Sequence, residues 1–287
     1  MKAKVGLALG SGSARGWAHI GVIRALEEAG VRPDVLCGCS IGALVGAAYA
    51  DSDLGDLEQW VSGLKWQDVV GLLDVSFSGG LFKGDKLFAF LERHFVDKDF
   101  SALPLPFGCV ATDLASGREV WLHDGSVAAA VRASLALPGL FTPVSRDGRL
   151  LVDGGLVNPV PVSLCRALGA DIVIAVDLGA DIVGSSLKRD EATERRGPGW
   201  TARLLTNLGL KRDNDLPSLA GVLATSLQIM QTRIARSRLA GEPADVLISP
   251  RLAHLGLMDY HRAADAIPEG AAAVQRMLPA IEYALNP

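Results

Sequence analysis

Hydrophobic positions along the chain fall into two patterns. Short continuous apolar runs are typical of buried strands, and longer segments with apolar residues every three or four positions are typical of helices with one packed face. The runs predict strands at 4–9, 35–39, 107–113, 118–122, 149–152, 171–177 and 245–249. The longer segments predict helices near 14–29, 41–51, 84–95, 126–136, 161–168, 219–238 and 268–284. Because the two kinds of element alternate, we predict a three-layer α/β/α sandwich with a mainly parallel central sheet, as one domain over 1–287.

Two segments depart from the alternation. Ala115-Ser116-Gly117 joins two strand-like runs and is typical of a hairpin, so we expect the sheet to be mixed. The segment 184–217 is charged and interrupted by proline and glycine, which predicts a mobile, solvated insertion. Its amphipathic stretch from Trp200 to Lys211 favours, as the functional alternative, a lid that touches lipid aggregates.

The predicted helix at 219–238 carries one apolar stripe, which we interpret as core packing. The stripe consists of Leu219, Val222, Leu223, Leu227, Met230 and Ile234. The helix ends with three arginines that suit a helix C-terminus, and a site for a charged headgroup is the alternative there. These are Arg233, Arg236 and Arg238.

Candidate chemistry begins at Gly38-Cys39-Ser40-Ile41-Gly42, which lies between a predicted strand and a predicted helix. A G-x-S-x-G pentapeptide in this setting is the arrangement that makes a serine a nucleophile. Glycine is needed at Gly38 and Gly42 because a Cβ would clash in so sharp a turn. The first N–H groups of the following helix point to where a negative oxygen would form. The alternative is that Ser40 is an ordinary helix N-cap.

A glycine-rich turn, Gly10-Ser11-Gly12-Ser13-Ala14-Arg15-Gly16, joins the first predicted strand to the first helix and presents N–H groups to an anion. The dinucleotide pattern G-x-G-x-x-G fails because Arg15 occupies its third glycine, and the sequence has no P-loop Lys-Ser/Thr pair. We therefore exclude a nucleotide and interpret N–H groups near Gly12 and Ser13 as an oxyanion hole facing Ser40, with an unliganded turn as the alternative. We expect the Arg15 side chain to brace the loop through a carboxylate rather than to meet a substrate phosphate.

Asp153 ends a predicted strand, and Gly154 and Gly155 after it let another chain come close. Asp-Gly-Gly is also ordinary turn chemistry, so this segment has little meaning alone. With the glycine turn and Ser40 it forms a set, each member following a predicted strand. We expect the set to meet at the carboxyl edge of the sheet, where open α/β sheets place their sites.

A catalytic triad in the order serine, acid, histidine needs a histidine after Asp153. Of the five histidines, His19, His94 and His123 precede it, and only His254 and His261 follow. Neither of these two lies in a special setting, so we expect both to be structural or on the surface. The alternative to a triad is a Ser–Asp dyad in which Asp153 takes the hydroxyl proton directly.

Composition limits the partners and the compartment. The 287 residues are 49% apolar and 21% charged, which is ordinary for a globular α/β protein. A net charge of −4 provides no basic surface for nucleic acid. The four cysteines lack a C-x-x-C pair, and we expect Cys37 and Cys109 to be buried thiols. With no signal segment and no run of 18 apolar residues, we expect a cytoplasmic protein, or one held peripherally at the inner membrane face.

The three motifs in this order resemble the patatin-like phospholipase family, especially its bacterial branch, which is similar to the catalytic domain of neuropathy target esterase. The segments Ala18–Val22, Ala133–Phe141 and Asn158–Val162 fit the same pattern, and the resemblance is strong over about 4–180 and weak beyond. It implies a serine acyl-hydrolase with a Ser40–Asp153 dyad, a glycine-loop oxyanion hole, an acyl-lipid or ester substrate and no cofactor or metal. Ser11 and Ser13 replace glycines often found in this loop, which leaves the backbone donors in place.

Two other function classes compete with this hypothesis. A non-catalytic regulatory or lipid-binding module on the same fold is disfavoured because Ser40, Asp153 and the glycine turn are all intact. A dinucleotide-binding oxidoreductase is disfavoured by Arg15 and by the nucleophile turn.

Overall fold

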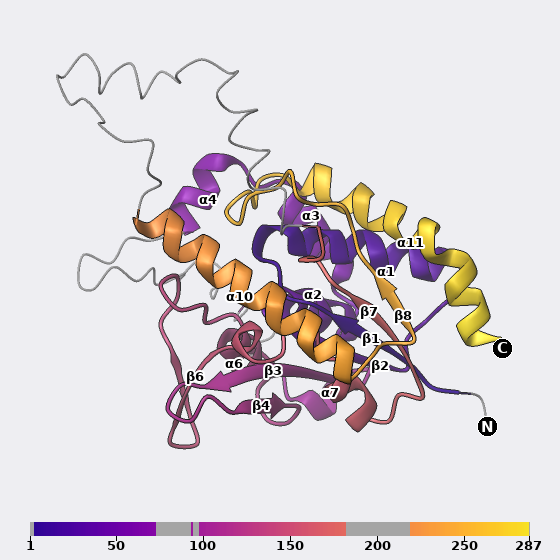
Figure 1. Cartoon of the computed structure of the whole chain (residues 1–287), viewed down its shortest axis with the longest axis horizontal. Coiled ribbons are helices and arrows are strands. Elements are labelled where there is room, and N and C mark those ends of the chain that lie inside the picture. The colour runs from indigo at the N-terminus through magenta and orange to yellow at the C-terminus, as the bar shows by residue number, and fades with distance from the viewer. Residues whose placement is uncertain (1–2, 73–92, 94–97, 182–218, 287) are drawn as a thin grey trace, which may run out of the picture.

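The computed structural model describes residues 3–72, 93, 98–181 and 219–286 (Figure 1). Within these residues the centre of the fold is an eight-stranded sheet. Its strands are β1 Val5–Leu9, β2 Val35–Cys39, β3 Phe107–Asp113, β4 Glu119–Leu122, β5 Val144–Arg146, β6 Arg149–Asp153, β7 Ile172–Val176 and β8 Val246–Ile248. The order is β5-β6-β3-β2-β1-β7-β8, and β4 pairs with β3 outside this path. Each predicted strand is present within one residue at either end, and only β5, three residues long, has no predicted counterpart.

The sheet is mixed, as predicted. Strands β3, β2, β1, β7 and β8 are parallel neighbours. Strands β4 and β6 run antiparallel to β3, and β5 runs antiparallel to β6. The turn from β3 to β4 contains Ala115-Ser116-Gly117, and Gly117 adopts φ 67°, a conformation that glycine tolerates best. The predicted hairpin is therefore confirmed.

Alternate side chains of the strands enter two different cores, which produces three layers. On one face, Leu7 and Leu36 pack with α1 Ala18–Glu28, α2 Ile41–Ala50, α6 Val127–Ser134 and α11 Ala263–Leu285. On the other face, Ala8 and Cys37 pack with α7 Val162–Ala167 and with α10 Leu219–Gly241, which crosses the front of Figure 1. The predicted α/β/α sandwich is confirmed. All four cysteines are buried free thiols, which confirms the expectation for Cys37 and Cys109.

Helices α1 and α11 touch backbone to backbone. A Cβ added to Gly21 would lie 1.8 Å from the Ile267 carbonyl oxygen, and one added to Gly270 would lie 1.9 Å from that of Ala18. Both glycines are therefore required for this close contact, in which α11 runs alongside α1 (Figure 1). Because α1 follows the glycine turn in the chain, this contact also holds the end of that turn in place.

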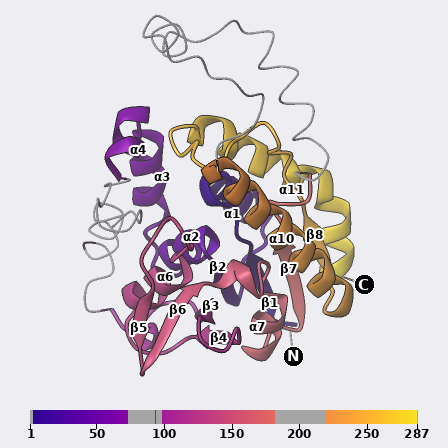
Figure 2. The same ribbon diagram turned by 60° about the vertical axis from the view of Figure 1, so that its left-hand side comes forward.

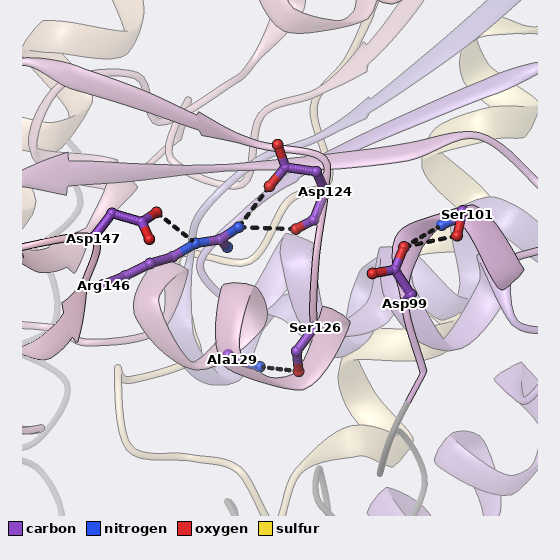
Figure 3. A network of polar contacts seen from close by, with 7 residues as sticks. All are labelled: Asp99, Ser101, Asp124, Ser126, Ala129, Arg146 and Asp147. Carbon is purple, nitrogen blue, oxygen red and sulfur yellow. Dashed lines mark hydrogen bonds and ion pairs between the residues drawn. The ribbon is translucent and has the colours of Figure 1, made fainter.

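Polar contacts at the β5 edge of the sheet fix the start of α6 (Figure 3). Arg146 of β5 donates hydrogen bonds to the carbonyl oxygen of Asp124 at 2.9 Å and to its carboxylate at 2.6 Å. Ser126 caps α6 by accepting a bond from the Ala129 N–H at 3.2 Å. Such a cap stabilises a helix by about 1 kcal/mol. Because α6 ends at Ser134, these contacts hold the far end of a helix that reaches the site described below.

Several predicted helices differ from the structure. The first begins as a 3-10 turn, η1 Ser13–Trp17, before α1. The last begins at Ala263 rather than 268 and contains Pro268. Helices α3 Leu54–Ser62 and α4 Trp66–Leu72, at the upper left of Figure 2, have no predicted counterpart. The predicted helix at 84–95, apart from residue 93, and the insertion at 184–217 lie outside the described residues.

The interpretation of the α10 stripe as core packing is wrong for Val222, Leu223 and Met230. Leu227 and Ile234 are half-buried, and the Leu219 side chain lies outside the described residues. Leu223 is 62% exposed and Met230 is 53% exposed, and Val222 and Ile229 are exposed beside them. The contacts of α10 with the smaller core come from its second half, through Ala235 and Leu239. The first half thus presents apolar side chains outward. None of the helices in the described ranges is long and apolar enough to cross a membrane.

Candidate active site

Ser40 occupies a sharp turn between β2 and α2. Its backbone adopts φ 55° and ψ −122°, a conformation that costs a residue with a side chain on the order of 1–3 kcal/mol. A Cβ added to Gly38 would lie 2.4 Å from the Gly42 carbonyl oxygen, and one added to Gly42 would lie 2.2 Å from that of Leu9. Both glycines of the G-x-S-x-G motif are therefore sterically required.

The Ser40 hydroxyl donates to the Asp153 carboxylate, with 2.5 Å between Oγ and Oδ2. Ser40 stands at the N-cap position of α2, yet its side chain makes no capping hydrogen bond. The alternative of an ordinary N-cap is therefore excluded. The uncapped N-terminus of α2 leaves its first N–H groups beside the hydroxyl.

Asp153 reaches Ser40 by a route that the sequence does not indicate. Strand β6 runs antiparallel to β3, so the chain reaches Asp153 from the opposite direction to that in which β2 reaches Ser40. Asp153 nevertheless meets Ser40 at the carboxyl end of β2, as expected. The register decides the meeting: Ala111 of β3 pairs with Asp153, and the preceding Val110 pairs with Cys39 of β2. Asp153 therefore lies level with Ser40, across one intervening strand.

Asp153 is completely buried and held by hydrogen bonds. Its Oδ1 accepts from the Gly155 N–H at 2.7 Å, and its own N–H donates to the Ala136 carbonyl at 2.9 Å. The Thr112 hydroxyl donates to the Asp153 carbonyl oxygen at 2.8 Å. Burial raises the pKa of Asp153 to about 6, although the bonds from Ser40 and Gly155 oppose the rise. The carboxylate is thus ionised at neutral pH and more basic than an exposed aspartate.

The two glycines after Asp153 allow close approach, as predicted. A Cβ added to Gly154 would lie 2.2 Å from the Val110 carbonyl oxygen. One added to Gly155 would lie 2.6 Å from Gln231 Nε2 of α10. Helix α10 consequently passes directly over the loop that carries the acid.

Ser134 also belongs to the site, although its role cannot be read from the motifs. Its buried hydroxyl accepts a bond from the Ser40 N–H at 2.9 Å and donates to the Val110 carbonyl at 2.7 Å. This bridge supports the strained backbone of Ser40. The only signal in the sequence is that Ser134 lies in a segment that fits the family pattern.

The glycine loop lies against the nucleophile turn. A Cβ on Gly16 would lie 2.2 Å from the Ile41 side chain, and one on Gly42 would lie 2.7 Å from the Gly10 carbonyl oxygen. The Gly10 and Ser11 N–H groups donate to backbone carbonyls. The N–H groups of Gly12 and Ser13 have no acceptor among the described residues. Within the described structure, these two N–H groups are thus free donors in a loop that packs against the turn of Ser40.

Arg15 braces this loop, as expected, but through a backbone group. Its Nε and Nη2 donate to the Leu255 carbonyl oxygen at 3.0 and 2.8 Å. The Arg15 side chain is buried. His19 holds the loop from α1, with Nε2 at 2.8 Å from the Gly10 carbonyl. Burial lowers the pKa of His19 to about 4, so the ring is neutral and donates through Nε2.

No histidine in the described part of the chain bonds to Ser40 or Asp153; the partners of the Asp153 carboxylate there are Ser40 and Gly155. The His254 side chain is exposed. The His261 ring packs edge-on against that of Trp66, with centroids 5.3 Å apart, in the turn before α11. His94 lies outside the described residues. Among the described residues, Ser40 and Asp153 thus form a hydrogen-bonded pair without a histidine.

The described residues contain no group of three or more His, Cys, Asp or Glu side chains that would hold a metal ion. The chemistry that their arrangement supports is acyl transfer through a serine, with a carboxylate as base and backbone donors for an oxyanion.

Comparison with known proteins identifies the family. A family model described as patatin-like phospholipase matches residues 7–166. An uncharacterized NTE family protein of Mycobacterium tuberculosis is 32% identical over 335 residues, which cover 97% of this chain and 92% of that protein. The chain belongs to the patatin-like phospholipase family. The family expected from the three motifs is thereby confirmed.

Two further relatives match a smaller share of this chain. Patatin-like phospholipase domain-containing protein 6 of Mus musculus is 38% identical over 184 residues, covering 61% of this chain and 14% of that protein. Lysophospholipase nte1 of Aspergillus fumigatus is 36% identical over 191 residues, covering 61% of this chain and 12% of that protein. The crystal structure of VipD from Legionella pneumophila has the same fold, with a TM-score of 0.57 at 16% identity, covering 97% of this chain and 67% of that one.

Proposed function

We propose that this patatin-like protein is a serine hydrolase of acyl-lipid esters, of the phospholipase A or lysophospholipase type, with Ser40 and Asp153 as a catalytic dyad. The observation that carries the proposal is the 2.5 Å hydrogen bond from the Ser40 hydroxyl to the buried Asp153 carboxylate. The names of the relatives, patatin-like phospholipase and lysophospholipase, support the substrate class.

In the first half of the reaction, Ser40 Oγ attacks the ester carbonyl carbon while Asp153 Oδ2 accepts the hydroxyl proton. The carbonyl oxygen becomes negative and accepts bonds from the free N–H groups of Gly12 and Ser13. When the tetrahedral intermediate collapses, Asp153 returns the proton to the departing alcohol oxygen, and Ser40 keeps the acyl group.

In the second half, a water molecule attacks the acyl-Ser40 ester. Asp153 takes a proton from this water and then gives it to Ser40 Oγ as the carboxylic acid leaves. A carboxylate of ordinary pKa is a weak base for this work. The raised pKa of Asp153, about 6, brings it closer to the range in which a general base is effective at neutral pH.

Lipid esters lie in aggregates, so the enzyme must meet a surface, and the first half of α10 suits that contact. Its exposed face combines Leu223 and Met230 with Arg233, one turn further along. The same helix passes over the acid loop at Gly155. We propose that this apolar face enters the lipid surface while the arginine meets anionic headgroups, which would bring the ester close to Ser40.

The proposal is tested with a serine-reactive fluorophosphonate probe and a panel of soluble esters and lysophospholipids. The probe should label Ser40, as identified by peptide mass mapping. Ser40→Ala should abolish labelling and lower hydrolysis by on the order of 10⁴-fold or more. Labelling of a different serine, with hydrolysis retained in Ser40→Ala, would overturn the assignment.

A further inference from the structure

Ser13 holds an unusual backbone conformation in the proposed oxyanion loop. Its φ is 53°, in the left-handed region that residues with a Cβ avoid at a cost of roughly 1–2 kcal/mol. A glycine would adopt this φ freely, whereas a serine needs other contacts to hold it there. The hydrogen bonds of the Ser13 side chain supply them.

The Ser13 hydroxyl makes two hydrogen bonds with the segment between β8 and α11. Its Oγ lies 2.7 Å from the Leu257 carbonyl oxygen and 2.6 Å from the Tyr260 hydroxyl. A carbonyl only accepts, so the single Ser13 hydroxyl proton goes to Leu257. The Tyr260 hydroxyl must therefore be the donor to Ser13.

Tyr260 is itself fixed in place. Its carbonyl accepts a bond from Trp17 Nε1 at 3.0 Å, and its ring packs edge-on against Trp17, with centroids 5.9 Å apart. Burial raises the pKa of Tyr260 to about 12, so its hydroxyl keeps the proton that it donates. In addition, the Ala14 N–H donates to the Leu257 carbonyl at 3.2 Å, which ties the neighbouring residue to the same segment.

We propose that Tyr260 is a positioning residue for hydrolysis: through the Ser13 hydroxyl it fixes the Ser13 backbone so that the Gly12 and Ser13 N–H groups point at the oxyanion. This inference rests on the proposed function. The N–H groups themselves receive no support from other described residues, so their direction depends on the loop conformation. An oxyanion donor interacts most strongly once negative charge has developed on the carbonyl oxygen. Its misalignment therefore raises the free energy of the transition state more than it weakens substrate binding.

Tyr260→Phe removes the donated bond and keeps the ring against Trp17. Since loss of a whole oxyanion donor lowers kcat by about 10²–10³-fold, a displaced donor should lower kcat roughly tenfold or more. KM for a soluble ester should stay within about twofold. The matched control is Tyr283→Phe, because Tyr283 is 75% exposed on α11 and should leave both constants unchanged.

A double-mutant cycle separates positioning from general destabilisation. In Ser13→Gly, the hydroxyl through which Tyr260 acts is gone, so adding Tyr260→Phe should change kcat by less than about twofold. An equal loss in both backgrounds, or a wild-type kcat in Tyr260→Phe, would overturn the proposal. If Tyr260→Phe does not fold, Ser13→Ala tests the same bond from its other partner, and a wild-type kcat there would be equally fatal.

Amide hydrogen exchange of residues 10–17 distinguishes failure of this inference from failure of the proposed function. The peptide should exchange faster in Tyr260→Phe than in the wild-type protein or in Tyr283→Phe. If the wild-type protein hydrolyses no ester, the proposed function fails, and exchange still decides whether Tyr260 orders the loop. An unchanged exchange rate in Tyr260→Phe would refute the positioning role of Tyr260, whatever the activity of the protein.

Discussion

Asp153→Asn should inactivate the enzyme and stabilise the protein at the same time. The substitution keeps the size of the side chain and an oxygen that can accept the Gly155 N–H, but it removes the buried charge. Turnover should fall on the order of 10⁴-fold because the base is lost. The gain in stability follows from the pKa of Asp153, which burial raises to about 6.

The sign follows from the direction in which burial moves that pKa. A carboxyl group whose pKa is higher in the folded state than in the unfolded chain, about 3.9, stabilises the fold while it is neutral. This contribution is complete below the unfolded pKa and is lost as the pH rises through about 6. The difference between the folded and unfolded pKa values corresponds to roughly 3 kcal/mol of unfolding free energy. Asparagine does not ionise, so the variant does not lose this unfolding free energy as the pH rises.

The net gain in unfolding free energy should be smaller, because the asparagine NH2 group that replaces Oδ2 cannot accept the Ser40 hydroxyl hydrogen bond. We expect about 1–3 kcal/mol at pH 8, or an increase in Tm of roughly 2–6 °C for a chain of this size. The difference between variant and wild type should shrink as the pH falls from 7 to 4. Asp99→Asn is the control: Asp99 is exposed, its bonds with Ser101 lower its pKa, and it lies beside Ser126 at the far end of α6 from Ser134.

Thermal unfolding of the wild-type protein, Asp153→Asn and Asp99→Asn between pH 4 and 8 checks the predicted change in stability. Ester hydrolysis at pH 8 checks the predicted loss of turnover. Asp99→Asn should keep wild-type turnover. A Tm difference for Asp153→Asn that is the same at pH 4.5 and pH 8, or that is negative at pH 8, would refute the account of the buried charge. Retained turnover would refute the role of Asp153 as base.

Three further outcomes are expected. The kcat/KM of the wild-type protein should rise with pH as Asp153 ionises and level off above about pH 7; a fall over that range would contradict a carboxylate base. His254→Ala and His261→Ala should each retain activity within about tenfold, or 1.4 kcal/mol of barrier, and a folded variant as inactive as Asp153→Asn would point to a triad. The double variant Leu223→Ser/Met230→Ser should lose more activity on anionic vesicles than on a soluble ester. Its control is Leu114→Ser/Leu150→Ser, which changes exposed leucines elsewhere. If the two double variants lose the same activity on anionic vesicles, the lipid contact does not lie on α10.

The sequence determined most of the strands, the family and the three motifs, because these depend on local rules. Apolar runs marked every strand except the short β5 within one residue, and Gly38 and Gly42 indicated a turn that excludes any Cβ. The order of the glycine turn, Ser40 and Asp153 was enough to indicate the family that the comparisons confirm.

Only the tertiary structure decided how these parts meet, because register, burial and long-range hydrogen bonds depend on residues far apart in the chain. The pairing of β3 with β6 sets Asp153 level with Ser40, although β6 runs in the opposite direction. The periodicity of α10 correctly indicated a helix but not which side faces solvent, since that depends on how far the sheet extends beneath it. Tyr260 contacts Ser13 across 247 positions of sequence, and no local pattern marks such a partner.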